Sequence, residues 1–377
     1  MDRPPCLLRL FLFNPDRMSD NISIEVVDSI APIRDDWKRL DDAARKAIDE
    51  TAIRPIDYSF YQTLPWNEFV EDYYTRIAPA KRQFKHLEYL VAKRDGVTVA
   101  ILPLLVCRLP KKVEFPSWKT SGINCVVSPG VSDPEMRPVF NRLLTFTAER
   151  FKGYKVKLYD VPLDTQFYDA LVSLPGLVAT ERESFHVPLS QFEDFDAYYA
   201  SLNKKLRHNI KTRSNHFTHG DLSWELREFD SQNPPSKEYW KKIWKIFYLR
   251  KLVWRNRSQS ALRKLYCRWE TRKEIRKGLK TASFTALKAS KLYSFEINGV
   301  PAAFAFIYEH DGFIVVPKLA IDTAQRAHAP GILMIKEIMR RCYDRGVRDF
   351  DFCRGSEPYK QQVGGVNTPI ARIKGKF

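Results

Sequence analysis

The sequence predicts a mixed α/β fold of the α+β kind, with two halves in which helices flank a mixed, mainly antiparallel sheet. The chain has 377 residues, 44% of them hydrophobic and 13% aromatic, which allows a large core and suits two domains better than one. Its C-terminal part has the pattern of three strands with tight turns, then a helix and a further strand. The N-terminal part has a similar order of strands and helices.

The clearest local pattern lies near the C-terminus. Two apolar strands, over 292–297 and 302–309, are separated by Asn298-Gly299, a dipeptide that tolerates positive φ and favours a two-residue hairpin turn. Asp311-Gly312 predicts a second turn, into a third strand over 313–321. We therefore expect an antiparallel meander.

A polar loop and an amphipathic helix follow the meander. The apolar positions of the helix recur at helical spacing: Ile332, Leu333, Ile335, Ile338 and Met339. We expect the helix to end at Gly346, and residues 347–352 to return to a strand. A helix that opens from a Gly-containing loop presents unpaired N–H groups, which suit a pyrophosphate. Residues 325–331 are thus a candidate phosphate-binding loop. Alternatively, the Pro-Gly step only ends the loop before the helix, as such steps commonly do.

The first half is expected to span residues 21–190. Its predicted elements are a strand at 24–27, a helix at 33–48, a helix from Trp66 to about 76, a hairpin at 88–107, a helix at 136–151 and a strand at 155–160. Residues 1–20 are expected to be a disordered leader or a wrongly assigned start, with Met18 as the initiator; a weak secretion signal is the alternative. No later run approaches the roughly 20 apolar residues of a transmembrane helix.

The second half, expected to span 191–377, begins with a basic helical segment over 201–291. Between residues 204 and 291 there are 24 Lys and Arg and 7 Asp and Glu, so that 24 − 7 = +17, the net charge of the whole chain. A solvated helical face, a site for an anionic ligand, polymer or lipid headgroup, and a nucleic-acid surface all fit this charge. Trp240, Trp244 and Phe247 recur within it at helical spacing, which favours core positions.

The six cysteines lie far apart, without CxxC spacing. This pattern predicts reduced thiols and a cytoplasmic location, and it indicates neither a disulfide framework nor a metal site. The histidines at 208, 216 and 219 form no recognised metal-binding arrangement.

The meander, loop, helix and returning strand resemble the core of the GNAT acyltransferase superfamily. More closely, the loop with Ala329-Pro330-Gly331 and the closing DFDFCRGSEPYK resemble bacterial acetyltransferases of the CelD/BcsL type, named for an association with cellulose biosynthesis and related to Fem-type aminoacyltransferases. The segments SLNKKLRHNIKTR (201–213) and FYLRKLVWR (247–255) resemble helical signatures of that family. The resemblance covers about 201–360, and more loosely 59–110. It implies two GNAT-like halves in tandem.

The resemblance also implies a binding site for acetyl-CoA or another acyl-CoA, with the pyrophosphate held by the loop and the helix N-terminus. The residues implied in this role are Val316, Leu319, Ile321, Gln325, Arg326, Ala329, Gly331 and Ile332. The loop departs from the RxxGxG/A pattern of ordinary GNAT enzymes. Backbone N–H groups between 316 and 321 would stabilise the developing oxyanion.

Acyl transfer from a thioester needs a base for the proton of the nucleophile and an acid for the departing thiolate. The candidate bases are Asp351 and Glu357. Asp349 and Asp351 are expected on one face of their strand, where two carboxylates raise one another's pKa. Alternatively, one of them pairs with Arg354 or Lys360 and the other caps a turn.

The remaining candidates each have a structural alternative. Tyr359 could protonate the thiolate or pack beside the site, and Lys360 could contact a CoA phosphate, an acidic acceptor or only solvent. Arg207 and Arg255 are candidate contacts to an anionic substrate. Trp66 could border an acceptor groove, or be a core aromatic.

The sequence therefore predicts a metal-independent acyl-CoA-dependent acyltransferase, acting by direct transfer on an amine or hydroxyl of a sugar, polysaccharide precursor or envelope metabolite. Its partner would be a small-molecule or glycan acceptor, with an anionic lipid or polymer as a further option. One alternative is a Fem-type transferase that uses aminoacyl-tRNA, for which the basic segment would bind the tRNA. Another is a non-catalytic protein that binds an anionic polymer or nucleic acid.

Overall fold

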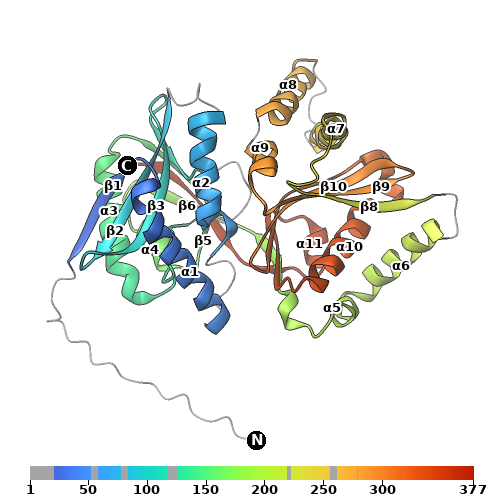
Figure 1. The fold of residues 1–377 in the computed structure, drawn as a ribbon, viewed down its shortest axis with the longest axis horizontal. Helices are drawn as coiled ribbons and strands as arrows, with labels where there is room; N and C mark the ends of the chain where they lie inside the picture. The colour runs from blue at the N-terminus through green and yellow to red at the C-terminus, as the bar shows by residue number, and fades with distance from the viewer. Residues whose placement is uncertain are drawn as a thin grey trace, which may run out of the picture.

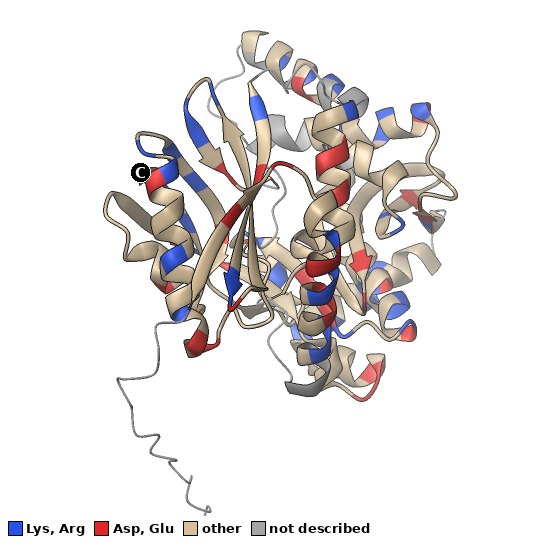
Figure 2. Cartoon of the chain, turned by 60° about the vertical axis from the view of Figure 1, so that its left-hand side comes forward, with Lys and Arg blue, Asp and Glu red and all other residues tan. Residues whose placement is uncertain are grey.

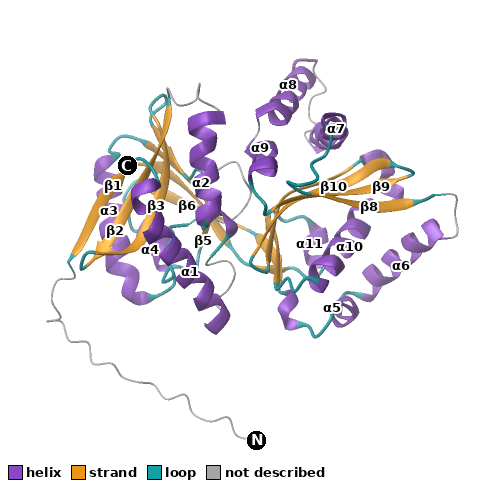
Figure 3. Cartoon of the chain, in the orientation of Figure 1, coloured by secondary structure: helices purple, strands orange, loops and turns teal. Residues whose placement is uncertain are grey.

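The structure is a computed structural model that describes residues 21–51, 58–77, 84–116, 125–218, 222–254, 261–277 and 279–377. Two seven-stranded sheets, each flanked by helices, make up the fold (Figures 1 and 3). Each sheet is mainly antiparallel and contains one parallel pair, β4 with β5 and β11 with β12. The predicted mixed α/β class with two halves is confirmed.

The strands of the two sheets are not contiguous in sequence. The first sheet has the order β1 (Ile22–Val27), β2 (Lys85–Arg94), β3 (Val97–Cys107), β4 (Lys112–Glu114), β5 (Lys155–Pro162), β14 (Ile370–Lys376) and β6 (Leu177–Arg182). The second has the order β13 (Val366–Asn367), β7 (Ser184–Val187), β12 (Asp349–Arg354), β11 (Phe313–Ile321), β10 (Val300–His310), β9 (Ser290–Ile297) and β8 (Trp224–Phe229).

The chain crosses between the sheets twice. It leaves the first sheet after β6 and enters the second at β7, and it returns to the first sheet when β13 is followed by β14. The C-terminal strand β14 thus lies between β5 and β6, and both of these strands belong to the N-terminal half of the sequence. The predicted division between residues 190 and 191 stays a prediction, but the strands of the two sheets do not separate there.

The predicted meander is confirmed in its turns. Asn298 and Gly299 have φ values of 49° and 74°, and Asp311 and Gly312 have values of 48° and 79°. These left-handed conformations are what a two-residue hairpin turn of the type I′ class requires. The turns therefore set the register of β9, β10 and β11 from local sequence alone.

Helices cover both faces of each sheet. In the first half these are α1 (Arg34–Thr51), α2 (Leu64–Asp72), α3 (Arg137–Arg150) and α4 (Gln166–Val172). In the second half they are α5 (Phe195–Ser201), α6 (Lys204–Thr218), α7 (Lys237–Trp254), α8 (Ala261–Lys277), α9 (Leu279–Ala286), α10 (Pro330–Asp344) and α11 (Pro358–Gln362). None of the helices in the described part of the chain has the length and apolar character needed to cross a membrane.

The second sheet has two different faces. On one face, α10 and α6 pack in a core that contains Ile210, Met334 and Phe352. On the other, α7 and α9 and the first half pack in a core that contains Trp244 and Tyr308. Figure 1 shows the sheet between α10 on one side and α7 on the other. The face that meets the first half is the one that carries the candidate active site.

The basic segment is spread over α6, α7 and α8, whose Lys and Arg residues are coloured in Figure 2. Of the three residues predicted as core positions, Trp240 and Trp244 on α7 are buried and Phe247 is half-buried. Leu206 and Ile210 on α6 are buried as well. Trp240 and Trp244 are thus core residues and are not available for stacking with bases.

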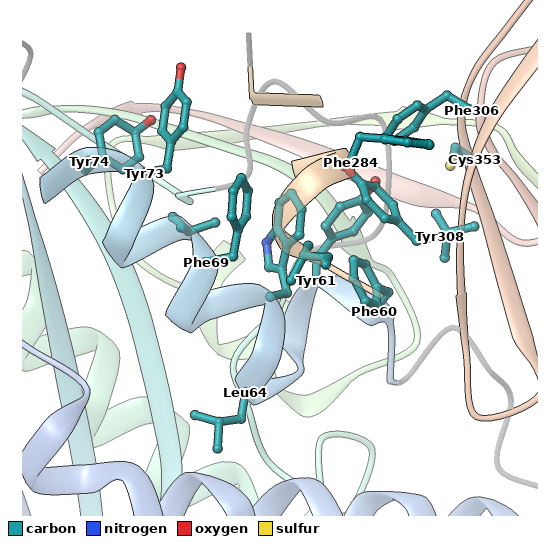
Figure 4. Close-up of a cluster of buried hydrophobic side chains, with 14 of the residues drawn as sticks. Phe60, Tyr61, Leu64, Phe69, Tyr73, Tyr74, Phe284, Phe306, Tyr308 and Cys353 are labelled. Atoms are coloured by element: carbon teal, nitrogen blue, oxygen red, sulfur yellow. The ribbon is translucent and has the colours of Figure 1, made fainter. Parts of the chain in front are cut away.

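An aromatic cluster joins the two halves (Figure 4). The rings of Phe60 and Tyr308 stack at a centroid distance of 4.6 Å, and Trp66 contacts Tyr308 edge-on at 5.3 Å. Aromatic pairs of this kind contribute about 0.5–1.5 kcal/mol each beyond their burial. The cluster fixes the short 3₁₀ helix over Phe60–Gln62 against the second sheet.

Candidate active site

The two parallel strands of the second sheet separate after a short contact. β11 and β12 pair at Phe313 with Asp349, Ile314 with Phe350 and Val315 with Asp351. Beyond this point β11 runs on to Ile321 along β10, while β12 pairs with β7 on its other edge. Asp351 is therefore the residue at which the two strands part. The backbone of β11 beyond Val315 is the segment predicted to bind the donor and the oxyanion.

Three titratable side chains share one face of the sheet at this point. His186 on β7 lies opposite Asp351 on β12 in the antiparallel register. Its Nδ1 lies 2.5 Å from Oδ2 of Asp349, two residues earlier on β12. Asp351 Oδ1 accepts a hydrogen bond of 2.6 Å from the backbone N–H of Cys353, whose φ of 60° turns the strand at that residue. The structure thus brings both predicted carboxylates together with a histidine.

Burial raises the pKa of Asp351 to about 7. The hydrogen bond from Cys353 N–H opposes this shift, and the nearby charge of Asp349 adds to it. Burial also raises the pKa of Asp349, against the hydrogen bond with His186. A carboxyl with a pKa near neutrality can accept and return a proton at physiological pH, which is the property of a general acid–base group.

The three side chains line a cavity of about 30 Å³ between the halves, large enough for a water-sized molecule. The wall from the first half is formed by Tyr58, Ser59 and Phe60. The hydroxyls of Tyr58 and Thr368, which also lines the cavity, are buried and have no hydrogen-bond partner within the part of the chain that the structure describes. Two polar groups are thus free to bind an acceptor or a solvent molecule.

The predicted donor loop follows β11. A 3₁₀ helix over Thr323–His328 is capped by Asp322, and Ala329 then adopts a left-handed conformation (φ 50°) before α10 begins at Pro330. A Cβ on Gly331 would lie 2.7 Å from Ile321 Cγ2, so the helix N-terminus is in close contact with the end of β11. The predicted donor residues therefore form one continuous surface from the end of β11 to the first turn of α10.

Their exposure differs along this surface. Val316 is buried, Leu319, Ile321, Gln325, Ala329, Gly331 and Ile332 are half-buried, and Arg326 is exposed. The first backbone N–H groups of α10 have no partner within the helix, as in any α-helix. The arrangement fits an anionic group of a donor, and the assignment of these residues stays a prediction.

Lys360 is placed differently from its prediction. Only 2% of its surface is exposed, and its Nζ donates to the carbonyls of Cys353, Arg354 and Gly355 at 2.9, 2.9 and 3.2 Å. It also pairs with Glu357 at 3.1 Å. The prediction that Lys360 contacts a CoA phosphate, an acceptor or solvent is wrong in this structure, because these bonds hold the ammonium inside the corner between β12 and α11.

Glu357 and Tyr359 flank this corner and lie outside the cavity. Glu357 precedes α11 at its N-terminus and pairs with Lys360. The ring of Tyr359 packs edge-on against Phe352 at 5.7 Å. Since Phe352 and Asp351 are consecutive strand residues, Tyr359 lies on the opposite face of β12 from Asp351.

The predicted substrate contacts are not brought to the cavity. Trp66 is fully buried in the aromatic cluster, so the prediction that it borders a groove is wrong and its core alternative holds. Arg207 on α6 is half-buried and donates from Nε to the carbonyl of Leu202. Arg255 lies outside the described residues.

Arg354 also has a partner that the sequence pattern did not indicate. Its Nη1 contacts both carboxylate oxygens of Asp160 on β5, at 3.1 and 2.9 Å, and so links the two sheets. The structural alternative for the two carboxylates was that one caps a turn and the other pairs with Arg354 or Lys360. Asp351 does accept a hydrogen bond within a turn, but Asp349 pairs with His186 instead.

Sequence reasoning missed His186. It lies 163 residues from Asp349, in a four-residue strand whose partner on β12 is known only from the fold. The one available signal was a histidine within the alternating run over 184–187, and that signal gives no partner.

Metal ligation finds no support in the described part of the chain, where no group of three or more His, Cys, Asp or Glu side chains could hold an ion. The thiols of Cys107, Cys342 and Cys353 are buried and form no disulfide within the described residues. The polar side chains that line the cavity are carboxyl, imidazole and hydroxyl groups, with His310 as a second histidine.

Comparison with known domains supports the class that this geometry suggests. Residues 254–361 match the acetyltransferase (GNAT) domain family, which confirms a GNAT-type acyltransferase. The matched range is less than a third of the chain and contains the donor surface, Asp349 and Asp351. The CelD/BcsL type stays a prediction. No curated protein matches the chain.

The fold is also found in solved structures. A crystal structure of FemX is 12% identical, with a TM-score of 0.52 over 90% of this chain and 96% of that one. A conserved protein of unknown function from Bacteroides thetaiotaomicron is 13% identical, with a TM-score of 0.50 over 94% and 100%. A tandem GNAT protein from the clavulanic acid biosynthesis pathway has a TM-score of 0.48 at 12% identity, over 93% and 98%. At these identities the likeness to the first two structures shows the fold and nothing finer.

Proposed function

We propose that the protein transfers an acyl group from an acyl-CoA, acetyl-CoA in the first instance, to an amine or hydroxyl of a sugar, polysaccharide precursor or envelope metabolite. The observation that carries the proposal is the position of Asp351. It stands where β11 and β12 part, in a cavity between the halves, and burial raises its pKa to about 7. A base in this place and with this pKa suits an acceptor that must lose a proton during attack.

In the proposed reaction Asp351 accepts the proton of the acceptor's amine or hydroxyl as that atom bonds to the thioester carbon. Backbone N–H groups of β11 beyond Val315 stabilise the oxyanion. The C–S bond then breaks and the thiolate takes a proton, for which Tyr359, on the other face of β12, is the predicted donor. No covalent intermediate on the enzyme is required. His186 and Asp349 position Asp351 and do not themselves exchange protons with the acceptor.

The cavity supports an acceptor with hydroxyl groups. The hydroxyls of Tyr58 and Thr368, which have no partner among the described residues, can each exchange a hydrogen bond with it, and Phe60 and Phe185 supply apolar walls. At about 30 Å³ the cavity can take the reacting group alone, so the rest of the acceptor would lie outside it.

Donor and base can be tested separately. Calorimetry with acetyl-CoA and with CoA should give saturable binding that is equal for the wild type and Asp351→Asn. Release of free thiol in the presence of amino sugars and hydroxyl acceptors should be lost in Asp351→Asn only. If no short-chain acyl-CoA binds, the proposal that the donor is an acyl-CoA is refuted. If Asp351→Asn retains full turnover, the proposal that Asp351 is the base is refuted.

The Fem-type alternative rests on the same fold and on the charge of +17 between residues 204 and 291. If the donor is an aminoacyl-tRNA, the protein should retain tRNA with an affinity that falls steeply with salt, because phosphate contacts release counterions. Acyl-CoA binding without tRNA binding would exclude this alternative.

A further inference from the structure

Helix α8 carries an exposed apolar stripe that the proposed reaction does not use. The stripe consists of Leu262, Leu265, Tyr266 and Trp269, whose exposed fractions are 83%, 68%, 53% and 54%. Their spacing of i, i+3, i+4 and i+7 places them on one side of the helix. The rings of Tyr266 and Trp269 lie 5.9 Å apart, so the aromatic part of the stripe is continuous.

The position of α8 leaves this side open. α8 packs against α7 and α9, and in Figure 1 it lies at the top edge of the molecule, above α9. Other exposed apolar residues, such as Val178 on β6 and Val300 on β10, lie far from one another in the sequence and on different sheets. Scattered residues of that kind are normal on a soluble surface, whereas a contiguous stripe marks an interaction site.

Basic residues border the stripe. Lys264, Arg268 and Arg272 are exposed and follow one another at helical spacing along one edge of it. They belong to the segment over 204–291 that carries the charge of +17. Over these two turns, leucines with Trp and Tyr can enter the interface of an anionic bilayer while the neighbouring bases meet the headgroups.

The composition of the stripe favours an anionic bilayer over two other partners, a nucleic acid and a second copy of the chain. The two most exposed residues are leucines, which gain free energy by entering hydrocarbon but offer no ring for stacking on a nucleobase. A second copy of the chain would bring two segments of the same large positive charge together, which is unfavourable. Anionic lipid headgroups complement that charge.

We propose that α8 docks the protein on the surface of an anionic phospholipid bilayer, with the stripe inserted among the acyl chains and Lys264, Arg268 and Arg272 facing the phosphates. The helix lies on the membrane and does not cross it. Docking requires neither the donor nor the acceptor, so it can be tested apart from the activity.

The test is co-sedimentation of the full chain with vesicles of equimolar phosphatidylglycerol and phosphatidylcholine, and with vesicles of phosphatidylcholine alone. Binding is expected to the mixed vesicles, and to weaken as salt is raised. Leu262→Ser with Leu265→Ser should weaken it by about tenfold or more, because the lost side chains no longer enter the hydrocarbon. Val178→Ser with Val300→Ser is the matched control and should bind as the wild type does.

Two further measurements make the result specific. Lys264→Gln, Arg268→Gln and Arg272→Gln together should remove the preference for anionic vesicles. Brominated lipid should quench tryptophan fluorescence in the wild type and less in Trp269→Phe, since that ring is expected at the depth of the lipid interface. Melting temperatures should be nearly unchanged in all stripe variants, because the substituted side chains are exposed.

Absence of binding to anionic vesicles at low salt would overturn the proposal, and so would binding that Leu262→Ser with Leu265→Ser leaves unchanged. Retention of RNA that is lost in Tyr266→Ala with Trp269→Ala, without vesicle binding, would assign the surface to nucleic acid. A dimer that the leucine variant dissociates would assign it to a second copy.

Discussion

The imidazole of His186 and the carboxylate of Asp349 form a hydrogen bond in which Nδ1 and Oδ2 are 2.5 Å apart. The pair joins β7, the first strand of the second sheet along the chain, to β12, one of its last. In the same register His186 lies opposite Asp351. The base of the proposed reaction is therefore held between a carboxylate on its own strand and a histidine on the neighbouring strand. Its environment depends on both.

Replacing Asp351 with Asn should abolish turnover while leaving the fold and donor binding intact, because the amide can still accept the hydrogen bond from Cys353 N–H. We expect a fall in kcat of about 10²–10⁴-fold. In the wild type kcat should rise with pH through about 7, as Asp351 loses its proton. The pH profile of kcat checks this, and a wild-type profile without a limb near that pH would contradict the role.

The same substitution should increase stability at high pH. Asp351 has a pKa of about 7 in the folded chain against 3.8 for an ordinary Asp carboxyl, so its contribution to stability is fully present below about pH 4 and is lost as the pH rises through 7. Asn cannot ionise, so the free energy of unfolding of the variant does not fall over this pH range for this reason. The difference in free energy of unfolding should grow to the order of 4 kcal/mol by pH 8. Urea denaturation at pH 4 and pH 8 measures it, and a difference that is independent of pH would rule out this origin.

His186 is a positioning residue in the proposed mechanism. Its charge lowers the pKa of Asp351, so His186→Leu should move the acidic limb of the kcat profile to higher pH and reduce kcat by about tenfold. His186→Asn keeps an amide donor near the position of Nδ1 for the bond to Asp349, but carries no charge. It should restore much of the kcat plateau and leave the limb displaced. A purely structural histidine would change the melting temperature without moving the limb.

Lys360 should matter for stability and not for donor affinity. Lys360→Met removes the ammonium that binds three carbonyls at the corner between β12 and α11, and should destabilise the fold by about 2–4 kcal/mol. Glu357→Gln is the matched control. It loses a partly exposed ion pair and should cost under about 1 kcal/mol. If a stably folded Lys360→Met variant binds acyl-CoA more weakly, Lys360 contributes to donor binding and this prediction is contradicted.

Gly331 lies where the donor loop meets the end of β11. In Gly331→Ala the new Cβ would lie 2.7 Å from Ile321 Cγ2, so the first turn of α10 must shift, at a cost of about 1–3 kcal/mol. We expect a larger loss in donor affinity than in the kcat of the saturated enzyme. Adding Ile321→Ala removes the clashing methyl and should recover part of both losses. Additive effects of the two substitutions would contradict the contact.

Local chemistry was sufficient for several parts of the fold. The dipeptides at 298–299 and 311–312 predicted both turns of the meander because positive φ is a property of those residues themselves. The spacing of apolar residues predicted α10, and strand alternation put Asp349 and Asp351 on one face. Each of these depends on neighbours within a few residues, and a period can be read without knowing what the element packs against.

Tertiary structure decided the composition of the site. Trp66 and Lys360 were candidates for contacts to a ligand, but the fold buries Trp66 in the aromatic cluster and Lys360 among carbonyl oxygens. His186 reaches Asp349 only because β7 crosses into the second sheet, as β14 crosses back into the first. Strand pairing across more than a hundred residues carries no local periodicity. The sequence alone therefore determined which elements form and which two carboxylates share one face of β12. Only the folded sheets decided which histidine lies beside them and how far Asp351 is buried.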